Sequence, residues 1–218
     1  MLNEAATIAI TLAALRRGAP DAEIVVVDGG SIDASAAIAR PLCDVLISAA
    51  RGRALQMNAG ARASHGDALV FVHADTIVPT TFAADIAAAL SDSAVNGGRF
   101  DVELDATALP YRIIGAMISL RSRISRTGTG DQAIFVRRAV FDRIGGFPEL
   151  ELCEDLEFSR RLKRAGRVAC LRTRVTTSAR RWNRDGVART VVRMWMIRAM
   201  YLMGVPPARL KRMYSDTR

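Results

Sequence analysis

The segment EIVVVD, residues 23–28, decides the fold, because it is a continuous apolar run that ends in an acid. Such a run is typical of a strand that is buried on both faces of a parallel sheet. Two glycines follow, and SIDASAAIAR (31–40) then has a helical pattern with Ser31 as its expected N-cap. A buried strand, a short turn and a helix in succession predict one unit of an α/β fold.

This strand–helix pattern repeats along the first half of the chain. Helices are expected at 4–17, 52–64 and 79–90, and strands at 44–48 and 68–75. The alternation predicts a Rossmann-like, mostly parallel sheet flanked by helices. In such a sheet, ligands bind beyond the carboxyl ends of the strands.

The pattern changes after residue 95. A half-exposed strand is expected at 97–104, a helix at 107–126, a further apolar segment at 132–138, and an amphipathic helix at 154–166.

The length of 218 residues suits one domain with a substantial core. No internal repeat and no long linker divides the chain. We therefore expect a single domain over 1–218, made of two halves and a C-terminal helical segment, at 1–94, 95–185 and 186–218.

The formal net charge of +9 predicts an anionic partner, which could be a nucleotide, a phospholipid surface or nucleic acid. Nucleic acid is disfavoured, because aromatic residues make up only 6% of the chain and no nucleic-acid motif is present. The three cysteines are widely spaced, no signal peptide is found, and the apolar stretches are too short to span a bilayer. We expect a cytoplasmic protein that is at most peripheral at the inner face of the membrane.

Acids follow two of the expected buried strands, at Asp28 and at Asp75. Turn formation explains one such acid, whereas two of them, each before a helix, favour a ligand site. Gly29 and Gly30 permit a close approach of the backbone, and the helix start at Ser31 favours phosphate. Neither G-x-G-x-x-G nor G-x-x-x-x-G-K-[ST] is present, which disfavours a dinucleotide dehydrogenase and a P-loop protein.

Three further groups of residues have both a structural and a functional interpretation. His73 lies two residues before Asp75, so both side chains would point the same way on an extended strand, although a histidine at a strand end is more often structural. The basic segment that contains Arg53 is either a solvated face or part of a phosphate site. Glu154 and Asp155 start a helix, where they either cap it or provide a general base.

Six segments in this order resemble the family 2 glycosyltransferases of the GT-A fold, and the resemblance covers residues 2–185. They are LNEAATI (2–8), VVVDGGSIDAS (25–35), GRALQMNAG (52–60), FVHADT (71–76), GDQAIFVRRAVFDRIGGFPEL (130–150) and CEDLEFSRRLKRAG (153–166). Several of them look most like a small bacterial subgroup sometimes associated with arsenosugar biosynthesis.

The resemblance implies a donor site in residues 1–94. Asn3 and Glu4 would lie beside the nucleotide, Asp28 would bond the base, usually uracil, and Arg53 would replace a lysine of the nucleotide-binding helix. The donor-binding residues implied are Asn3, Glu4, Asp28, Gly29, Gly30, Ser31, Arg53, His73 and Asp75.

Asp75 matches the last acid of an Asp-x-Asp motif that holds a divalent cation, Mn²⁺ or Mg²⁺, on the donor diphosphate. His73 replaces the first acid of that motif, which puts its metal or ribose contact in doubt. Such a cation needs few protein ligands when diphosphate oxygens supply the others.

The resemblance places catalysis in residues 95–185. Asp155 matches the catalytic base of the family's Glu-Asp pair. The segment SARRW (178–182) stands where many members have Gln-x-x-Arg-Trp, with Ser178 in place of the glutamine. On the acceptor or diphosphate side it implies Asp131, Gln132, Glu154, Arg181 and Trp182.

The function implied is an inverting glycosyltransferase that moves a sugar from a nucleotide-diphosphate sugar, usually a UDP-sugar, to a hydroxyl acceptor. The alternative is a non-catalytic protein that binds nucleotide or sugar on the same scaffold.

Residues 191–214 mix arginines with methionines and aromatic residues. Such a helix could pack on the domain, form a homodimer, or lie on an anionic membrane. Arg193 and Arg198 are about 140° apart on a helix, so no clean polar face forms. Packing or dimerisation is therefore favoured.

The family's chain opens with a short apolar strand before the Leu-Asn-Glu segment, whereas here Leu2 follows Met1 directly. That first strand would be central, between the strands that end near Asp28 and Asp75. We expect translation to start upstream, or about five to ten residues to be lost from this sequence. Without the strand, Asn3 and Glu4 are expected to extend from a free terminus.

Overall fold

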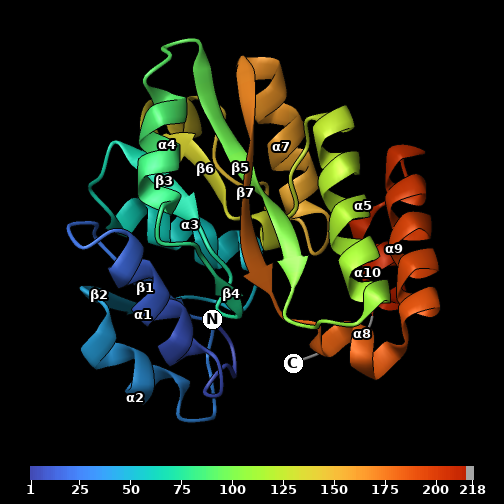
Figure 1. Cartoon of the computed structure of the whole chain (residues 1–218), viewed down its shortest axis with the longest axis horizontal. Coiled ribbons are helices and arrows are strands. Elements are labelled where there is room, and N and C mark those ends of the chain that lie inside the picture. The colour runs from blue at the N-terminus through green and yellow to red at the C-terminus, as the bar shows by residue number, and fades with distance from the viewer. Residues whose placement is uncertain (215–218) are drawn as a thin grey trace.

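The strand–turn–helix unit expected at residues 23–40 forms in the computed structural model, which describes residues 1–214 (Figure 1). β1 (Val25–Asp28) pairs in parallel with β2 (Val45–Ser48). The helices around this pair are α1 (Ile8–Gly18), α2 (Ser35–Ala39), the 3-10 turn η1 (Arg40–Leu42) and α3 (Arg53–Ala63). Ile8 and Leu12 of α1 pack with Val26 of β1, so the apolar run is buried as its sequence predicts.

The second sheet has the strand order β3-β6-β5-β7-β4. These strands are β3 (Ala68–Phe71), β4 (Thr76–Ile77), β5 (Val95–Leu104), β6 (Ile134–Arg137) and β7 (Arg167–Thr177). Only β5 and β7 are parallel neighbours in this sheet, and its other three ladders within residues 1–214 are antiparallel. The α/β class is confirmed, but the sheet is mixed instead of mostly parallel.

The long strand β5 was expected to be half exposed and is instead almost wholly buried. Helix α5 (Leu109–Ser125) lies directly against it, because a Cβ at Gly115 would come within 2.9 Å of the Val102 carbonyl oxygen. Phe100 of β5 packs on the other side with Phe82 of α4 (Phe82–Leu90). Because helices cover β5 on both faces, most of its residues are buried, polar ones included, although the alternation of polar and apolar residues predicts one exposed face.

The helix that begins with the Glu-Asp pair is held by an aromatic cluster. α7 (Glu154–Ala165) inserts Phe158, whose ring stacks on Phe147 with centroids 4.0 Å apart. Phe71 and Phe141, the latter from α6 (Arg138–Arg143), complete the cluster. This packing places the first turn of α7 beside the end of β3 and the 3-10 turn η2 (Gly130–Gln132).

The C-terminal segment forms α8 (Arg180–Asp185), α9 (Val187–Leu202) and α10 (Pro207–Met213). α9 lies beside α5 in Figure 1, and α10 packs against α9. α9 packs on the domain through Thr190 and Ile197. Residues 215–218 of the expected C-terminal segment lie outside the described residues. Within residues 1–214, no helix has both the length and the apolar character of a transmembrane span.

β1 and β3 do not pair with each other, and a cavity of about 730 Å³ lies between them. Val25 and Val27 of β1 line it from one side, and Val70 of β3 lines it from the other. This is the place expected for an additional central strand.

Met1 lies at one end of that cavity. Its amino group donates to the Val27 carbonyl oxygen at 2.6 Å, and its own carbonyl accepts from the Gly29 N–H at 2.9 Å. The residues after Met1 are therefore anchored beside β1, and the expectation that Asn3 and Glu4 extend from a free terminus is wrong.

Candidate active site

The loop after β1 and the N-terminal residues form one hydrogen-bonded unit. The Asn3 N–H donates to Ser31 Oγ at 3.0 Å, and the Ile32 N–H donates to Asn3 Oδ1 at 3.0 Å. Asp28 accepts from both the N–H and the hydroxyl of Ser31. Asn3, Asp28 and Ser31 thus meet as the resemblance implies.

The two glycines of this loop have different structural reasons. Gly30 has φ of +88°, a conformation that residues with a Cβ rarely adopt. A Cβ at Gly29 would come within 2.6 Å of Gln56 Nε2. The loop is therefore a close-packed turn, and Ser31 is not the N-cap of α2, which is Ala34.

Asp75 and Glu4 share one cationic partner. Arg180 Nη2 lies 2.7 Å from Glu4 Oε2 and 3.1 Å from Asp75 Oδ2. Among the described residues, Asp75 Oδ1 is a buried oxygen with no hydrogen-bond partner. Arg180 was not identified from the sequence as a site residue, because its neighbour Arg181 matched the family pattern. The only indication of Arg180 in the sequence was the pair of arginines in SARRW (178–182).

This carboxylate pair fits a divalent cation. Oxygen atoms of carboxylates are the ligands that Mn²⁺ and Mg²⁺ prefer, and the unpartnered Asp75 oxygen offers one coordination position. Within the described residues, no three His, Cys, Asp or Glu side chains converge on one metal position. A cation here would therefore need other oxygens to complete its coordination.

His73 and Asp75 do not lie on one extended strand. β3 ends at Phe71, and residues 73–76 form a turn closed by the Thr76 N–H and the His73 carbonyl oxygen at 3.0 Å. The His73 imidazole instead contacts Asp131, with Nδ1 3.2 Å from Oδ1. The prediction that the strand extends to residue 75 was therefore wrong, and the His73 side chain contacts η2 through Asp131.

Asp131 stays ionised because of its cationic neighbours. Burial acts to raise its pKa, but the hydrogen bond and the charge of His73, together with Arg181 and Arg53, hold the pKa well below its usual range. Asp131 and His73 both line a second cavity, which contains the predicted catalytic residue.

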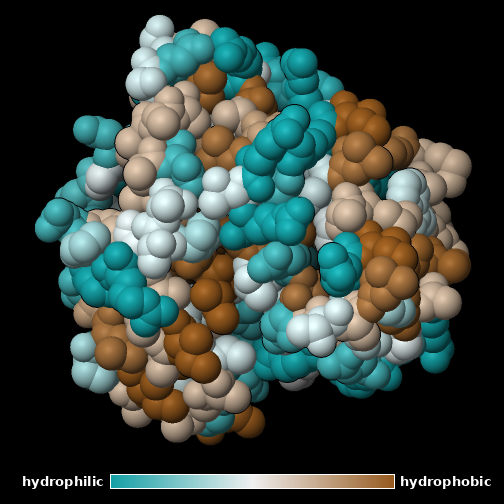
Figure 2. Space-filling model, viewed as in Figure 1, coloured by the Kyte–Doolittle hydropathy of each residue, from teal (hydrophilic) through white to brown (hydrophobic). Residues whose placement is uncertain are grey.

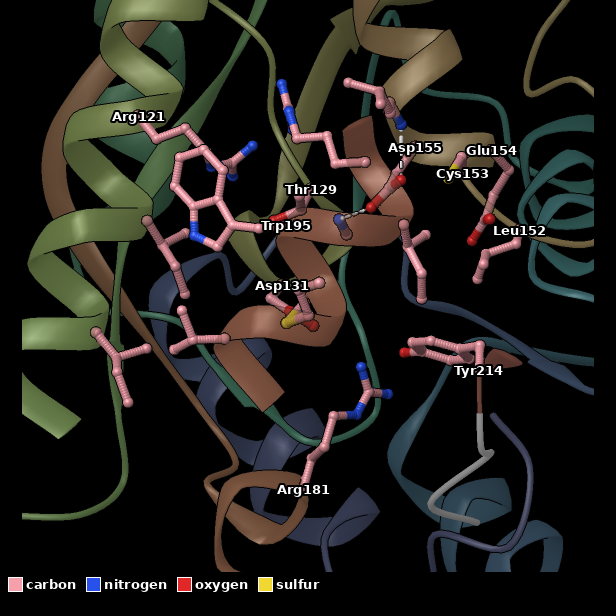
Figure 3. A pocket seen from close by; sticks show the side chains of 18 of the residues that line it. Arg121, Thr129, Asp131, Leu152, Cys153, Glu154, Asp155, Arg181, Trp195 and Tyr214 are labelled. Atoms are coloured by element: carbon pink, nitrogen blue, oxygen red, sulfur yellow. Dashed lines mark hydrogen bonds between the residues drawn. The ribbon is translucent and has the colours of Figure 1, made fainter. Parts of the chain in front are cut away.

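Asp155 is fixed by backbone donors at the start of α7. Its Oδ2 accepts from the Gly130 N–H at 2.8 Å, and its Oδ1 accepts from the Leu156 N–H at 2.7 Å (Figure 3). Each carboxylate oxygen has a second lone pair, so Asp155 can still accept a proton from a ligand. The capping role and the role of a base are therefore compatible in this geometry.

Glu154 lies next to Asp155 but is buried and faces Arg53. Burial, with the charge of Asp155, raises the pKa of Glu154. The Arg53 guanidinium, 3.6 Å away, opposes this rise with a smaller effect than burial and Asp155 together. Burial acts to lower the pKa of Arg53, but Tyr214 and Glu154 raise it above its usual value. Arg53 is the first residue of α3.

The cavity has a volume of about 180 Å³ and is lined by both charged and apolar side chains. The charged ones are acids and arginines: Arg53, Arg121, Asp131, Glu154, Asp155, Arg181 and Arg198. The apolar ones from α5 and α9 are Ile114, Met117, Ile118, Val191, Met194 and Trp195. Figure 3 shows Trp195 beside Arg121, across the cavity from Tyr214 and Arg181.

Two arginines of this cavity, Arg121 and Arg198, were not identified from the sequence. Burial and the charge of Arg198 lower the pKa of Arg121 to about 10. Arg198 donates to Thr127 Oγ1 at 3.0 Å. Neither arginine lies in a recognisable motif, so only the folded chain brings them to Asp155.

Of the remaining predicted residues, two line the cavity and one does not. Arg181 stacks on Tyr214, with its guanidinium 4.7 Å from the ring centroid, and Trp182 is buried with its indole at the cavity wall. Gln132 is fully buried and donates to the Phe100 carbonyl oxygen at 3.0 Å. Its amide stabilises the η2 turn, its side chain does not line this cavity, and its place on the acceptor side stays a prediction.

Comparison with known proteins identifies the fold and the family. A comparison with curated proteins found no match. Among solved structures, S. aureus TarS 1–349 has a TM-score of 0.65 and 18% identity over 98% of this chain and 67% of that one. The mannosyltransferase PcManGT from Pyrobaculum calidifontis, in complex with GDP-Man and Mn²⁺, has a TM-score of 0.68 and 20% identity over 98% of this chain and 65% of its own.

A third structure is glucosyl-3-phosphoglycerate synthase from Mycobacterium tuberculosis in complex with Mn²⁺ and UDP-glucose. Its TM-score is 0.54 at 18% identity, over 82% of this chain and 67% of that one. The chain thus spans about two thirds of the length of these structures, which share its fold. The family model described as Glycosyl transferase family 2 matches residues 1–147. Because this match covers more than half of the 218 residues, the chain belongs to glycosyl transferase family 2.

Proposed function

We propose that the chain is an inverting glycosyltransferase that moves a sugar from a nucleotide-diphosphate sugar, with UDP as the nucleotide, to a hydroxyl acceptor. The observation that carries this proposal is the Asp155 carboxylate, which two backbone N–H groups hold at the wall of the cavity. Two solved structures of the same fold contain a nucleotide sugar and Mn²⁺, which supports the donor class. The segments at 52–58, 73–76, 130–138 and 154–162 support placement in the small bacterial subgroup sometimes associated with arsenosugar biosynthesis.

The donor would lie between the β1 loop and the cavity. Asp28 and Asn3, fixed by Ser31, present a carboxylate and an amide to the base and ribose. Arg53 and Arg181 line the cavity and offer planar guanidinium groups that suit diphosphate oxygens.

Asp75 and Glu4 would hold the divalent cation. When bound, the cation neutralises the charge that develops on the leaving diphosphate. Arg180 already provides a positive charge at these two carboxylates and pairs with Asp75 Oδ2, so it would compete with a cation for Asp75.

The chain's own residues account for the proton and the charge. Asp155 accepts the proton of the acceptor hydroxyl, and the hydroxyl oxygen attacks the anomeric carbon opposite the leaving group. The bond from that carbon to the diphosphate breaks, and its electron pair stays on the diphosphate. Arg53 and Arg181 balance the resulting negative charge, the type of stabilisation that is usually the largest catalytic contribution.

The test is the release of UDP from a UDP-sugar in the presence of Mn²⁺, with water as the acceptor. Asp155→Asn should reduce release about 10²–10⁴-fold, because the amide cannot take up a proton. Glu157→Gln is the matched control, since Glu157 lies on the same helix and bonds Tyr201 and Arg160 instead of lining the cavity. Donor affinity, measured by calorimetry, should be unchanged in both variants.

Two results would contradict the proposal. If Asp155→Asn releases UDP at more than about a tenth of the wild-type rate, Asp155 is not the base. If the wild-type chain binds the donor but releases no UDP, even with candidate acceptors, it is a binding protein on the same scaffold.

A further inference from the structure

The outward side of α5 carries a row of exposed apolar residues. Leu109, Ile113, Met117, Leu120 and Ile124 are three or four positions apart, so they lie within about 80° of the helix circumference. Leu120 is 59% exposed and Ile124 is 77% exposed. This row is one continuous apolar stripe that faces away from the protein.

The opposite side of α5 explains how the helix can pack without these residues. It buries Gly115, Ser119 and Ser122, and Ser119 Oγ accepts from the Val102 N–H at 3.1 Å. The side that contacts β5 combines these small and polar residues with two apolar ones, Ile114 and Ile118, which pack in clusters with residues of β5. The five residues of the exposed row are not among the residues that α5 buries.

α9 and its C-cap residue, Met203, carry a second exposed apolar row, whose other members are Val192, Trp195, Met196 and Leu202. They lie within about 120° of the helix circumference. Trp195 is 52% exposed and Met203 is 75% exposed.

Two of the three arginines of α9 are turned toward the domain, whereas Arg189 is exposed. Arg193 donates to Asp185 Oδ2 at 3.0 Å, and Arg198 donates to Thr127 Oγ1 at 3.0 Å. The helix lacks a clean polar face, as its sequence indicates, because two of its three charged side chains bond on the packed side. Its outward side is mainly apolar, with Arg189 as its exposed charge.

The two rows form one surface, which we call the α5–α9 apolar surface. Ile118 of α5 packs in the same cluster as Val191 and Met194 of α9, so the helices lie side by side. Figure 2 shows hydrophobic residues gathered over this part of the molecule, at the right of the view. Met117 and Trp195 belong both to this surface and to the wall of the candidate active-site cavity. The surface therefore continues into that cavity.

The charges around this surface select the kind of partner. α5, α9 and α10 contain nine arginines and lysines and no acid. Arg112, Arg189, Arg209 and Arg212 are exposed. A contact between two copies would be two-fold symmetric and would place these like charges against one another. An anionic surface instead complements them.

We propose that the α5–α9 apolar surface docks on a lipid bilayer that carries anionic headgroups. The apolar side chains enter the interfacial region without crossing the membrane, and the surrounding arginines contact the headgroups. Trp195 suits this depth, because indole rings concentrate at membrane interfaces. Met117 and Trp195 belong both to this surface and to the lining of the candidate active-site cavity. Docking would therefore place the apolar side of that cavity at the bilayer surface.

The test is co-sedimentation of the full chain with lipid vesicles at physiological salt. The double variant Leu120→Glu/Ile124→Glu changes two exposed residues that do not line the cavity. Ile10→Glu is the matched control, because Ile10 is 56% exposed on α1, which lies away from α5 and α9 in Figure 1. Met203→Glu, on the α9 row, gives a second independent variant should the double variant not fold.

The wild-type chain and Ile10→Glu should bind vesicles that contain phosphatidylserine. Binding to pure phosphatidylcholine vesicles, and binding of the surface variants to either kind, should be at least about tenfold weaker. Absence of wild-type binding, or equal binding by the surface variants, would overturn the proposal. So would a wild-type dimer in light scattering that the surface variants convert to a monomer, because the surface would then belong to a second copy.

Discussion

Replacement of Arg180 by alanine tests the cation position most directly. In the structure, its Nη2 lies 2.7 Å from Glu4 Oε2 and 3.1 Å from Asp75 Oδ2. The Glu4 side chain is fully buried and that of Asp75 is 18% exposed, whereas that of Arg180 is 46% exposed. Arg180→Ala therefore leaves two carboxylates close together in a poorly solvated place without this guanidinium.

The magnitude follows from these exposures. Removing one partner of a fully buried ion pair costs about 3–5 kcal/mol, and an exposed pair contributes only about 0–1 kcal/mol. Because Arg180 is nearly half exposed, solvent screening places the expected loss in the free energy of unfolding at about 1–2 kcal/mol. For a chain of this length, the melting temperature should fall by about 2–8 °C.

The assay is thermal and urea unfolding of the wild type, Arg180→Ala and a control. Arg167→Ala is the control, because Arg167 pairs with Asp92 at 2.7 Å but both side chains are well exposed. Its effect should stay within about 0.5 kcal/mol. The second measurement adds Mn²⁺ without nucleotide, which stabilises a chain that binds it only when folded.

Mn²⁺ should raise the melting temperature of Arg180→Ala more than that of the wild type, because the guanidinium no longer competes for Asp75. Equal Mn²⁺ shifts in the two proteins would refute the assignment of Asp75 and Glu4 as the cation position. Unchanged stability of Arg180→Ala would refute the electrostatic reasoning itself.

Three further predictions concern neighbouring residues. Asp75→Ala should remove the Mn²⁺ dependence of nucleotide-diphosphate affinity in calorimetry, whereas the surface control Asp85→Ala should keep it; a dependence retained by Asp75→Ala would exclude the metal role. Asp131 has a depressed pKa in the folded chain, so it stabilises the fold above its unfolded pKa of about 3.8, and this stabilisation is lost as pH falls toward the lower folded value. Asp131→Asn should therefore lower the urea midpoint at neutral pH, with the difference shrinking below about pH 4, and a difference independent of pH would contradict this. Gly130→Ala would bring a Cβ into collision with the His73 imidazole, in the loop whose Gly130 N–H bonds Asp155. The displaced loop should lower UDP release by up to about 10²-fold. Gly66→Ala is the control and should have no effect, because its Cβ would make an ordinary contact at 3.5 Å with the Ala68 carbonyl oxygen.

The sequence determined the elements whose signals are local. The apolar run before Asp28, the two glycines after it and the amphipathic pattern from Glu154 onward predicted β1, its loop and α7 close to where they occur. The donor loop and Asp155 could be located for the same reason, because each sits at the end of such an element. Burial of a short segment and the start of a helix depend mainly on neighbouring residues.

The tertiary structure alone decided which elements became neighbours. β7 was not expected, yet it pairs in parallel with β5, covers its edge and helps to bury it. Likewise, β3 pairs with β6 in the opposite direction, which no residue within β3 specifies. Strand order and direction depend on contacts between distant segments, so the mixed character of the sheet could not be derived from periodicity.

The same limit applies to the side chains that meet in the site. His73 contacts Asp131, 58 positions away, and Arg180 reaches Asp75, 105 positions away. A charged residue's local sequence does not specify its partner across the fold, and Arg181 was therefore chosen over Arg180. The outward apolar rows of α5 and α9 were hidden for a related reason: helical periodicity shows that a face is apolar, but only the packed chain shows whether that face points to the core or to solvent.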